Sequence, residues 1–122
     1  MKVLLVNELR IGNLLYNDNV IVKIDARSIF DIWDDKGIKT YKPILLTEEW
    51  LLNFGFEKSN RLDLGELKPC YAIFSLAIMI RHNSFFIDWI GGNTELKYVH
   101  QLQNLYFALI GEELTLNKTN DK

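Results

Sequence analysis

The chain has few of the side chains that build metal centres and crosslinks. Its 122 residues include one cysteine, Cys70, and two histidines, His82 and His100. A single cysteine forms no intrachain disulfide, which favours a reducing compartment. A structural zinc site takes about four nitrogen or sulfur ligands at short spacing, and these three residues stand one at a time. We therefore expect neither a disulfide nor a metal.

Long apolar runs are also absent. The longest, Tyr71 to Ile80, has ten residues and includes a serine, whereas a membrane span needs about 20. The first residues do not form a secretory leader, because Asn7, Glu8 and Arg10 soon interrupt the apolar start. These features predict a soluble, cytoplasmic protein with no membrane partner.

No surplus of either charge marks the chain for nucleic acid. There are 14 basic and 16 acidic side chains, spread along the whole length, whereas phosphate binders usually carry a concentrated basic patch. Folding could still gather basic side chains. A small nucleic-acid-binding domain, with RNA as one ligand, is therefore kept as the alternative hypothesis. Its phosphate contacts would come from the N-terminal hairpin and beyond: Arg10, Lys23, Arg27 and Arg81.

Motifs for catalysis and cofactors are missing. No phosphate-binding glycine loop occurs. The stretch from Asp31 to Gly37 fails as a calcium loop, because Trp33 stands at its third position and Lys42 at its twelfth. Cys70 precedes an apolar run and fits a small core residue better than a nucleophile. We expect no enzyme and no cofactor. An enzyme with a site of unrecognised type is the least favoured reading.

Patterning and turn residues predict an α+β fold in which an antiparallel sheet of hairpins carries two packed helices. A single domain is expected over 1–116, followed by a flexible tail over 117–122. The first predicted elements are a hairpin of 10–16 with 20–26, whose second strand continues through Ile32, and a helix over 47–54. A loop or an irregular edge over 57–70 follows. The last are a hairpin of 71–80 with 84–90, a helix over 97–110 and a closing strand over 112–116. Periodicity leaves open whether 71–80 is a strand or a buried helix.

The polar side of the second helix is the main candidate for partner binding. His100, Gln103, Asn104 and Phe107 fall at helical spacing and form one stripe that ends in an aromatic ring. Amide and imidazole groups both donate and accept hydrogen bonds, which suits contact with a protein or with single-stranded RNA. The alternative is a solvated face with Phe107 half-buried. Trp33, among aspartates, is the tryptophan expected at the surface and fits a protein partner.

Three stretches resemble a family of small proteins from Bacteroidota and their phages. They are ELRIGN at 8–13, LLTEEWLLNFGF at 45–56 and YVHQLQNLYFAL at 98–109. The resemblance implies a prophage or mobile-element setting and transfers no catalytic residue. Small phage proteins without catalytic motifs often bind host machinery. The first hypothesis is thus a non-catalytic binding module for a host protein or ribonucleoprotein, for instance an anti-CRISPR inhibitor of an RNA-guided nuclease.

Overall fold

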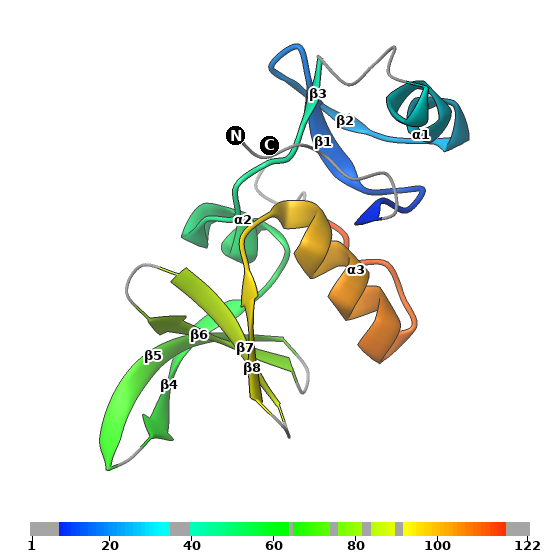
Figure 1. The fold of residues 1–122 in the computed structure, drawn as a ribbon. Helices are drawn as coiled ribbons and strands as arrows, with labels where there is room; N and C mark the ends of the chain where they lie inside the picture. The colour runs from blue at the N-terminus through cyan, green and yellow to red at the C-terminus, as the bar shows by residue number, and fades with distance from the viewer. Residues whose placement is uncertain are drawn as a thin grey trace. The chain divides into compact units, whose positions relative to one another are not determined.

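The fold belongs to the α+β class, as predicted. A computed structural model describes residues 8–34, 40–63, 65–73, 76–81, 84–89 and 92–116. In these residues, three helices accompany one antiparallel sheet of three strands and one of five (Figure 1). None of the helices in the described part of the chain is long and apolar enough to cross a membrane.

Two compact units make up the chain. The first comprises Met1–Leu45 with Tyr98–Glu113, and the second Leu46–Lys97 with Leu114–Lys122. The single domain over 1–116 stays a prediction, and the tail over 117–122 lies outside the described residues.

The sheet of the first unit is built around a tight hairpin. Strands β1 (Leu14–Asn17) and β2 (Val20–Lys23) pair antiparallel, and the short β3 (Tyr41–Lys42) pairs with the other side of β1. Asp18 and Asn19 form the turn with φ of 53° and 70°. Two left-handed residues in a two-residue loop match the twist of paired strands. The predicted hairpin is confirmed, with shorter strands.

Helix α1 (Ala26–Trp33) replaces the strand expected to continue through Ile32, so that prediction is wrong. Its start is a capping box. The Asp25 carboxylate accepts a hydrogen bond from the Ser28 backbone at 3.0 Å, and Ser28 Oγ accepts one from the Asp25 backbone at 3.3 Å. Ile29 and Ile32 share one side of the helix and pack on a core that includes Leu15. The β-branched isoleucines favour a strand, although their spacing of three also fits a helix.

Helix α3 (Val99–Ile110) confirms the predicted C-terminal helix and lies next to β1 in the first unit. It ends at Gly111, whose φ of 87° is left-handed. A backbone hydrogen bond of 2.8 Å from Val99 to Ile44 joins its start to the segment after β3. The closing strand expected over 112–116 is wrong, because these residues form no strand.

In the second unit, helix α2 (Glu48–Asn53) confirms the predicted helix. The Thr47 side chain accepts a hydrogen bond from the Trp50 backbone. At the other end, Gly55 has a φ of 98°, and the Phe56 backbone donates to the Leu51 carbonyl at 3.0 Å. This left-handed stop folds Phe56 back on Leu51, and both side chains are buried.

The rest of the second unit is a five-stranded antiparallel meander. Its strands follow in chain order, each paired with the next: β4 (Glu57–Asp63), β5 (Glu66–Ile73), β6 (Leu76–Arg81), β7 (Ser84–Trp89) and β8 (Gly92–Leu96) (Figure 1). A loop over 57–70 is wrong, because β4 and most of β5 occupy this segment, whereas the alternative of an edge agrees with the place of β4 at the edge of the sheet. The described residues of 71–80 are strand rather than helix, but they belong to two strands. The hairpin across residues 82–83 is confirmed by the pairing of β6 with β7.

Both faces of this sheet carry buried side chains. Tyr71, Ile78 and Ile87 stand side by side on neighbouring strands and are almost fully buried. On the opposite face Cys70 pairs with Met79, and both are also buried. Cys70 is thus a free core thiol, which agrees with the expectation that it packs instead of reacting.

Candidate functional site

The polar stripe of α3 faces the interior of the first unit. His100 is 0% and Gln103 2% exposed, Asn104 is partly buried, and only Phe107 keeps substantial exposure at 40%. The expectation that this stripe forms an exposed binding surface is therefore wrong for His100 and Gln103. Their burial is possible because hydrogen bonds from residues 8–14 replace those with water.

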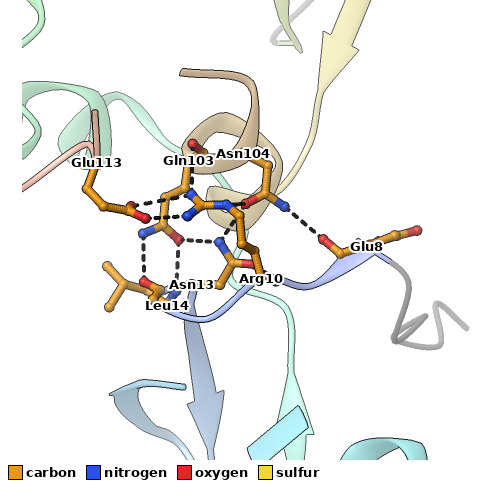
Figure 2. A network of polar contacts seen from close by, with 8 residues as sticks. Glu8, Arg10, Asn13, Leu14, Gln103, Asn104 and Glu113 are labelled. Carbon is orange, nitrogen blue, oxygen red and sulfur yellow. Dashed lines mark hydrogen bonds and ion pairs between the residues drawn. The ribbon is translucent and has the colours of Figure 1, made fainter. Parts of the chain in front are cut away.

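Both the oxygen and the nitrogen of the Gln103 side-chain amide form hydrogen bonds. Its Oε1 accepts hydrogen bonds from the Leu14 backbone at 2.8 Å and from Asn13 Nδ2 at 3.5 Å, while its Nε2 donates to the Gly12 carbonyl at 3.2 Å (Figure 2). A flipped amide would place donor against donor and acceptor against acceptor. One orientation of Gln103 therefore fixes residues 12–14 against α3.

Asn13 and Asn104 extend these contacts towards the N-terminus. Asn13 is fully buried. Its Oδ1 accepts from the Arg10 backbone at 2.7 Å, and its Nδ2 donates to Asn104 Oδ1 at 2.8 Å. Asn104 Nδ2 then donates to the Glu8 carbonyl at 2.8 Å. The two amides thus tie the N-terminal segment to α3 by both donors and acceptors (Figure 2).

Arg10 closes the network at the surface. Its Nε donates to Asn104 Oδ1 at 3.1 Å, and its guanidinium group forms an ion pair with the Glu113 carboxylate. The Arg10 Cζ also lies 4.3 Å from the centre of the Phe107 ring. The structure thereby joins Arg10, which the nucleic-acid hypothesis used, to Asn104 and Phe107, which the partner-binding hypothesis used. A guanidinium held by a carboxylate, an amide and a ring is poorly placed to contact phosphate.

His100 belongs to the same cluster. Its Nε2 lies 3.2 Å from Glu8 Oε1, and its ring stacks on that of Tyr98 with centroids 5.9 Å apart. We call the seven side chains that meet here the polar network; its members are Glu8, Arg10, Asn13, His100, Gln103, Asn104 and Glu113. These side chains bind one another and the backbone, so the polar network stabilises the fold of the first unit.

The remaining basic residues of the nucleic-acid hypothesis do not meet in one described patch. Lys23 on β2 and Arg27 on α1 are exposed in the first unit. Arg81 ends β6 in the second unit, and its side chain lies outside the described residues. Of the four basic residues of this hypothesis, Lys23 and Arg27 are thus the ones whose described side chains are exposed.

The exposed side of α1 carries two large aromatic rings. Trp33 is 64% and Phe30 51% exposed, whereas Ile32 between them in sequence is 2% exposed. The two rings lie 5.8 Å apart at an interplanar angle of 37° and form one aromatic pair. The expectation that Trp33 lies at the surface is confirmed. Phe30 was missed because its segment was assigned to a strand, although the capping box and the i, i+3 spacing were available as signals.

This aromatic pair is the candidate functional site. Trp33 and Phe30 are held by a helix that is anchored in the core through Ile29 and Ile32. Isolated exposed apolar residues are common, but two adjacent rings on a fixed helix form a preformed contact surface. In the described part of the chain, no group of three or more histidine, cysteine, aspartate or glutamate side chains could hold a metal ion.

Comparisons of the chain with protein-family models, with curated proteins and with solved structures give no match. What the molecule does has to be inferred from its own side chains.

Proposed function

We propose that this chain is a non-catalytic binding module that holds a protein partner on the outward side of α1, with Phe30 and Trp33 as the anchoring side chains. The observation that carries the proposal is the exposed aromatic pair, 5.8 Å between ring centres, on a helix fixed to the core. Tryptophan is among the residues most enriched at the energetic centres of protein interfaces.

Preorganisation supports the same conclusion. The Asp25–Ser28 capping box fixes the start of α1, and Ile32 fixes its side that faces the core. Because this surface is already ordered, little conformational entropy would be lost when a partner binds. Truncation of a central tryptophan at an interface costs about 2–4 kcal/mol, or roughly 30- to 1,000-fold in Kd.

The setting comes from the resemblance of 8–13 and 98–109 to phage and prophage proteins of Bacteroidota. It makes the partner a host protein or ribonucleoprotein, and an RNA-guided CRISPR nuclease is the specific candidate to test. The polar network adds to this proposal only indirectly, because it fixes α3 and the N-terminal segment that support the unit carrying α1.

The test is capture of partners from a host lysate by the full chain, with and without nuclease treatment. We expect a protein that survives nuclease, is lost with the double variant Phe30→Ala, Trp33→Ala, and is kept with Leu109→Ala. Leu109 is a matched control because it is a large apolar residue on α3 with 59% exposure. A purified RNA-guided nuclease with its guide is then assayed for inhibition by the same variants.

Two results would contradict the proposal. Equal capture by the wild type and the double variant would remove α1 from the interface. Capture that disappears on nuclease treatment would favour the nucleic-acid hypothesis, for which Lys23 and Arg27 are the exposed residues to replace.

A further inference from the structure

We infer that the sheet face of the first unit which carries Tyr16 binds single-stranded nucleic acid, with a base stacked on the Tyr16 ring and phosphates held by Lys23 and Lys42. The inference goes beyond the proposed function, because it gives the first unit a second ligand. It uses none of the side chains of the aromatic pair on α1.

The register of the strands brings these side chains together. β1 lies between β2 and β3 in the sheet (Figure 1), and Tyr16 on β1 is paired with Ile21 on one side and with Lys42 on the other. Cross-strand partners share a face, with their Cβ atoms about 4.5–5.5 Å apart. Lys23 lies two positions after Ile21 on β2 and therefore on the same face. We call these four residues, Tyr16, Ile21, Lys23 and Lys42, the tyrosine face.

The tyrosine face is open to solvent. Both of its lysines are exposed, Ile21 is 47% exposed and Tyr16 is partly exposed. Leu14, two positions before Tyr16 on β1, is buried in the part of this strand that contacts α3. On the opposite face of the sheet, Leu15 is fully buried in a core against which α1 packs. The tyrosine face is thus an exposed region with an aromatic ring between two cationic side chains.

Both charges on the tyrosine face are positive. In the part of the chain that the structure describes, neither Lys23 nor Lys42 forms an ion pair with a carboxylate. The two aspartates of this region lie at the ends of β2. Asp25 accepts hydrogen bonds from Ser28 and caps α1, and Asp18 lies in the hairpin turn. The charge of the face is therefore complementary to an anionic ligand.

The ring selects among anionic ligands. The edge strands that carry the two lysines are about 10 Å apart, because neighbouring strands lie about 4.8 Å apart. A small anion satisfies a lysine but leaves the Tyr16 ring without a partner. A single nucleic-acid strand supplies phosphates along its length, together with bases that stack on aromatic rings whatever their sequence. The bases of a duplex are already stacked on one another, so a single strand is the form that uses the ring and both lysines.

The test is fluorescence anisotropy of a labelled oligonucleotide of mixed sequence, titrated with the full chain. The oligonucleotide is used as single-stranded RNA, as single-stranded DNA and as a duplex, over a range of salt concentrations. The variants are Tyr16→Leu, Tyr16→Phe, the double variant Lys23→Gln, Lys42→Gln, and the control Arg27→Gln. Arg27 is matched because it is an exposed basic residue of the same unit on α1, which packs on the opposite face of the sheet. Circular dichroism first establishes that each variant keeps its secondary structure.

We expect a single strand, as RNA or as DNA, to bind more tightly than the duplex. Tyr16→Leu should raise Kd about 5- to 150-fold because the stacked base is lost, whereas Tyr16→Phe keeps the ring and should keep the affinity. The plot of log K against log salt should have a slope of about −1.4 for two phosphate contacts on a single strand. That slope should approach zero in the double lysine variant and stay unchanged in Arg27→Gln. The lysine variant alters only exposed side chains, so it tests the inference even if Tyr16→Leu fails to fold.

Four results would overturn the inference. They are no binding of either single strand at low salt, duplex binding as tight as single-strand binding, equal loss of affinity in Tyr16→Leu and Tyr16→Phe, and an unchanged salt slope in the double lysine variant. Polyglutamate serves as a competitor, and its binding with the same dependence on Tyr16 would also overturn the inference, because it makes an acidic protein segment the ligand.

The outcome is independent of the proposed function. Replacement of Phe30 and Trp33 by alanine should leave oligonucleotide binding unchanged. A protein that survives nuclease in the lysate capture should in turn be retained by Tyr16→Leu. Either surface can therefore fail its test while the other passes.

Discussion

Replacement of Gln103 by methionine should destabilise the first unit far more than the same change at Gln101. Methionine nearly keeps the volume of glutamine and its helix propensity but removes the amide. At Gln103 the change leaves the Leu14 N–H and the Gly12 carbonyl without the side-chain partners found at 2.8 Å and 3.2 Å. Asn13 Nδ2 loses only its longer contact and keeps the hydrogen bond to Asn104.

The magnitude follows from these two groups. A buried polar group left unpaired costs about 1–3 kcal/mol, so two give about 2–6 kcal/mol. We expect a loss in the lower half of this range, about 2–4 kcal/mol. Gly12 is partly exposed, so its carbonyl can accept a hydrogen bond from water instead. At Gln101 the side chain accepts one hydrogen bond from the Tyr98 backbone at a partly exposed helix start. Its loss should cost about 1 kcal/mol.

Urea unfolding followed by circular dichroism measures the difference in free energy between the two variants. Amide hydrogen exchange adds a local measurement, since the Leu14 N–H should exchange faster once its acceptor is gone. Equal destabilisation by Gln103→Met and Gln101→Met, with unchanged Leu14 exchange, would refute the view that the polar network holds residues 12–14 to α3.

Three further changes test other parts of the structure. Arg10→Lys should lower stability by about 1–2 kcal/mol in urea unfolding, because lysine cannot form the fork to Glu113. Gly111→Ala should cost about 1–2 kcal/mol in the same assay, because its φ of 87° is left-handed. The pKa of Tyr71 is raised from 10.0 to about 12 by burial and by the Glu48 carboxylate. Stability that depends on neutral Tyr71 is therefore complete below pH 10 and is lost as pH rises through 12, and Glu48→Gln should shift the tyrosinate absorbance titration to lower pH.

Each of these has a matched control. Arg27→Lys, on the exposed side of α1, should leave stability nearly unchanged, and an equal loss would remove the special role of Arg10. Glu49→Gln, next to Glu48 on the exposed side of α2, should leave the titration of Tyr71 where it is. For Gly111, thermal unfolding of an asparagine variant should fall between glycine and alanine, because asparagine tolerates the left-handed region; identical values would refute the backbone argument.

The elements that were predicted correctly from the sequence are those whose ends are marked by capping or turn residues close by in the chain. Helix α2 is preceded by the N-cap Thr47 and followed by the left-handed Gly55, and each of these acts through residues no more than five positions away. The β1–β2 turn depends on Asp18 and Asn19 alone. Such signals are complete within a short window, so no knowledge of the tertiary structure is needed to use them.

Elements that depend on distant partners were misread. Strand β4 reads as a loop because it is an edge strand whose residues 57–60 are polar and exposed, and the polar alternation shows no buried face. The apolar run 71–80 looks like one strand because apolar residues, Ile73 and Leu76, stand on both sides of the point where β5 ends and β6 begins. In α1, the β-branched isoleucines obscured a helix whose capping box was readable.

Of the two residues of the candidate site, the sequence predicts one. Trp33 was recognised as exposed from its acidic neighbours, but its partner Phe30 requires α1 to be known as a helix. The stripe of α3 was recognised as a set, and its spacing was right. The side of the molecule that this stripe faces was predicted wrongly. A row of amide side chains has the same sequence pattern whether it faces water or a backbone segment about 90 residues away in sequence.

The segments 8–13 and 98–109 meet in the polar network, through Asn13 with Gln103 and Arg10 with Asn104, although they lie about 90 residues apart in sequence. These contacts hold the first unit together. A resemblance carried by such residues would predict a shared fold more directly than a shared activity. A binding function therefore has to be tested on side chains outside the polar network, such as the exposed rings of Phe30 and Trp33.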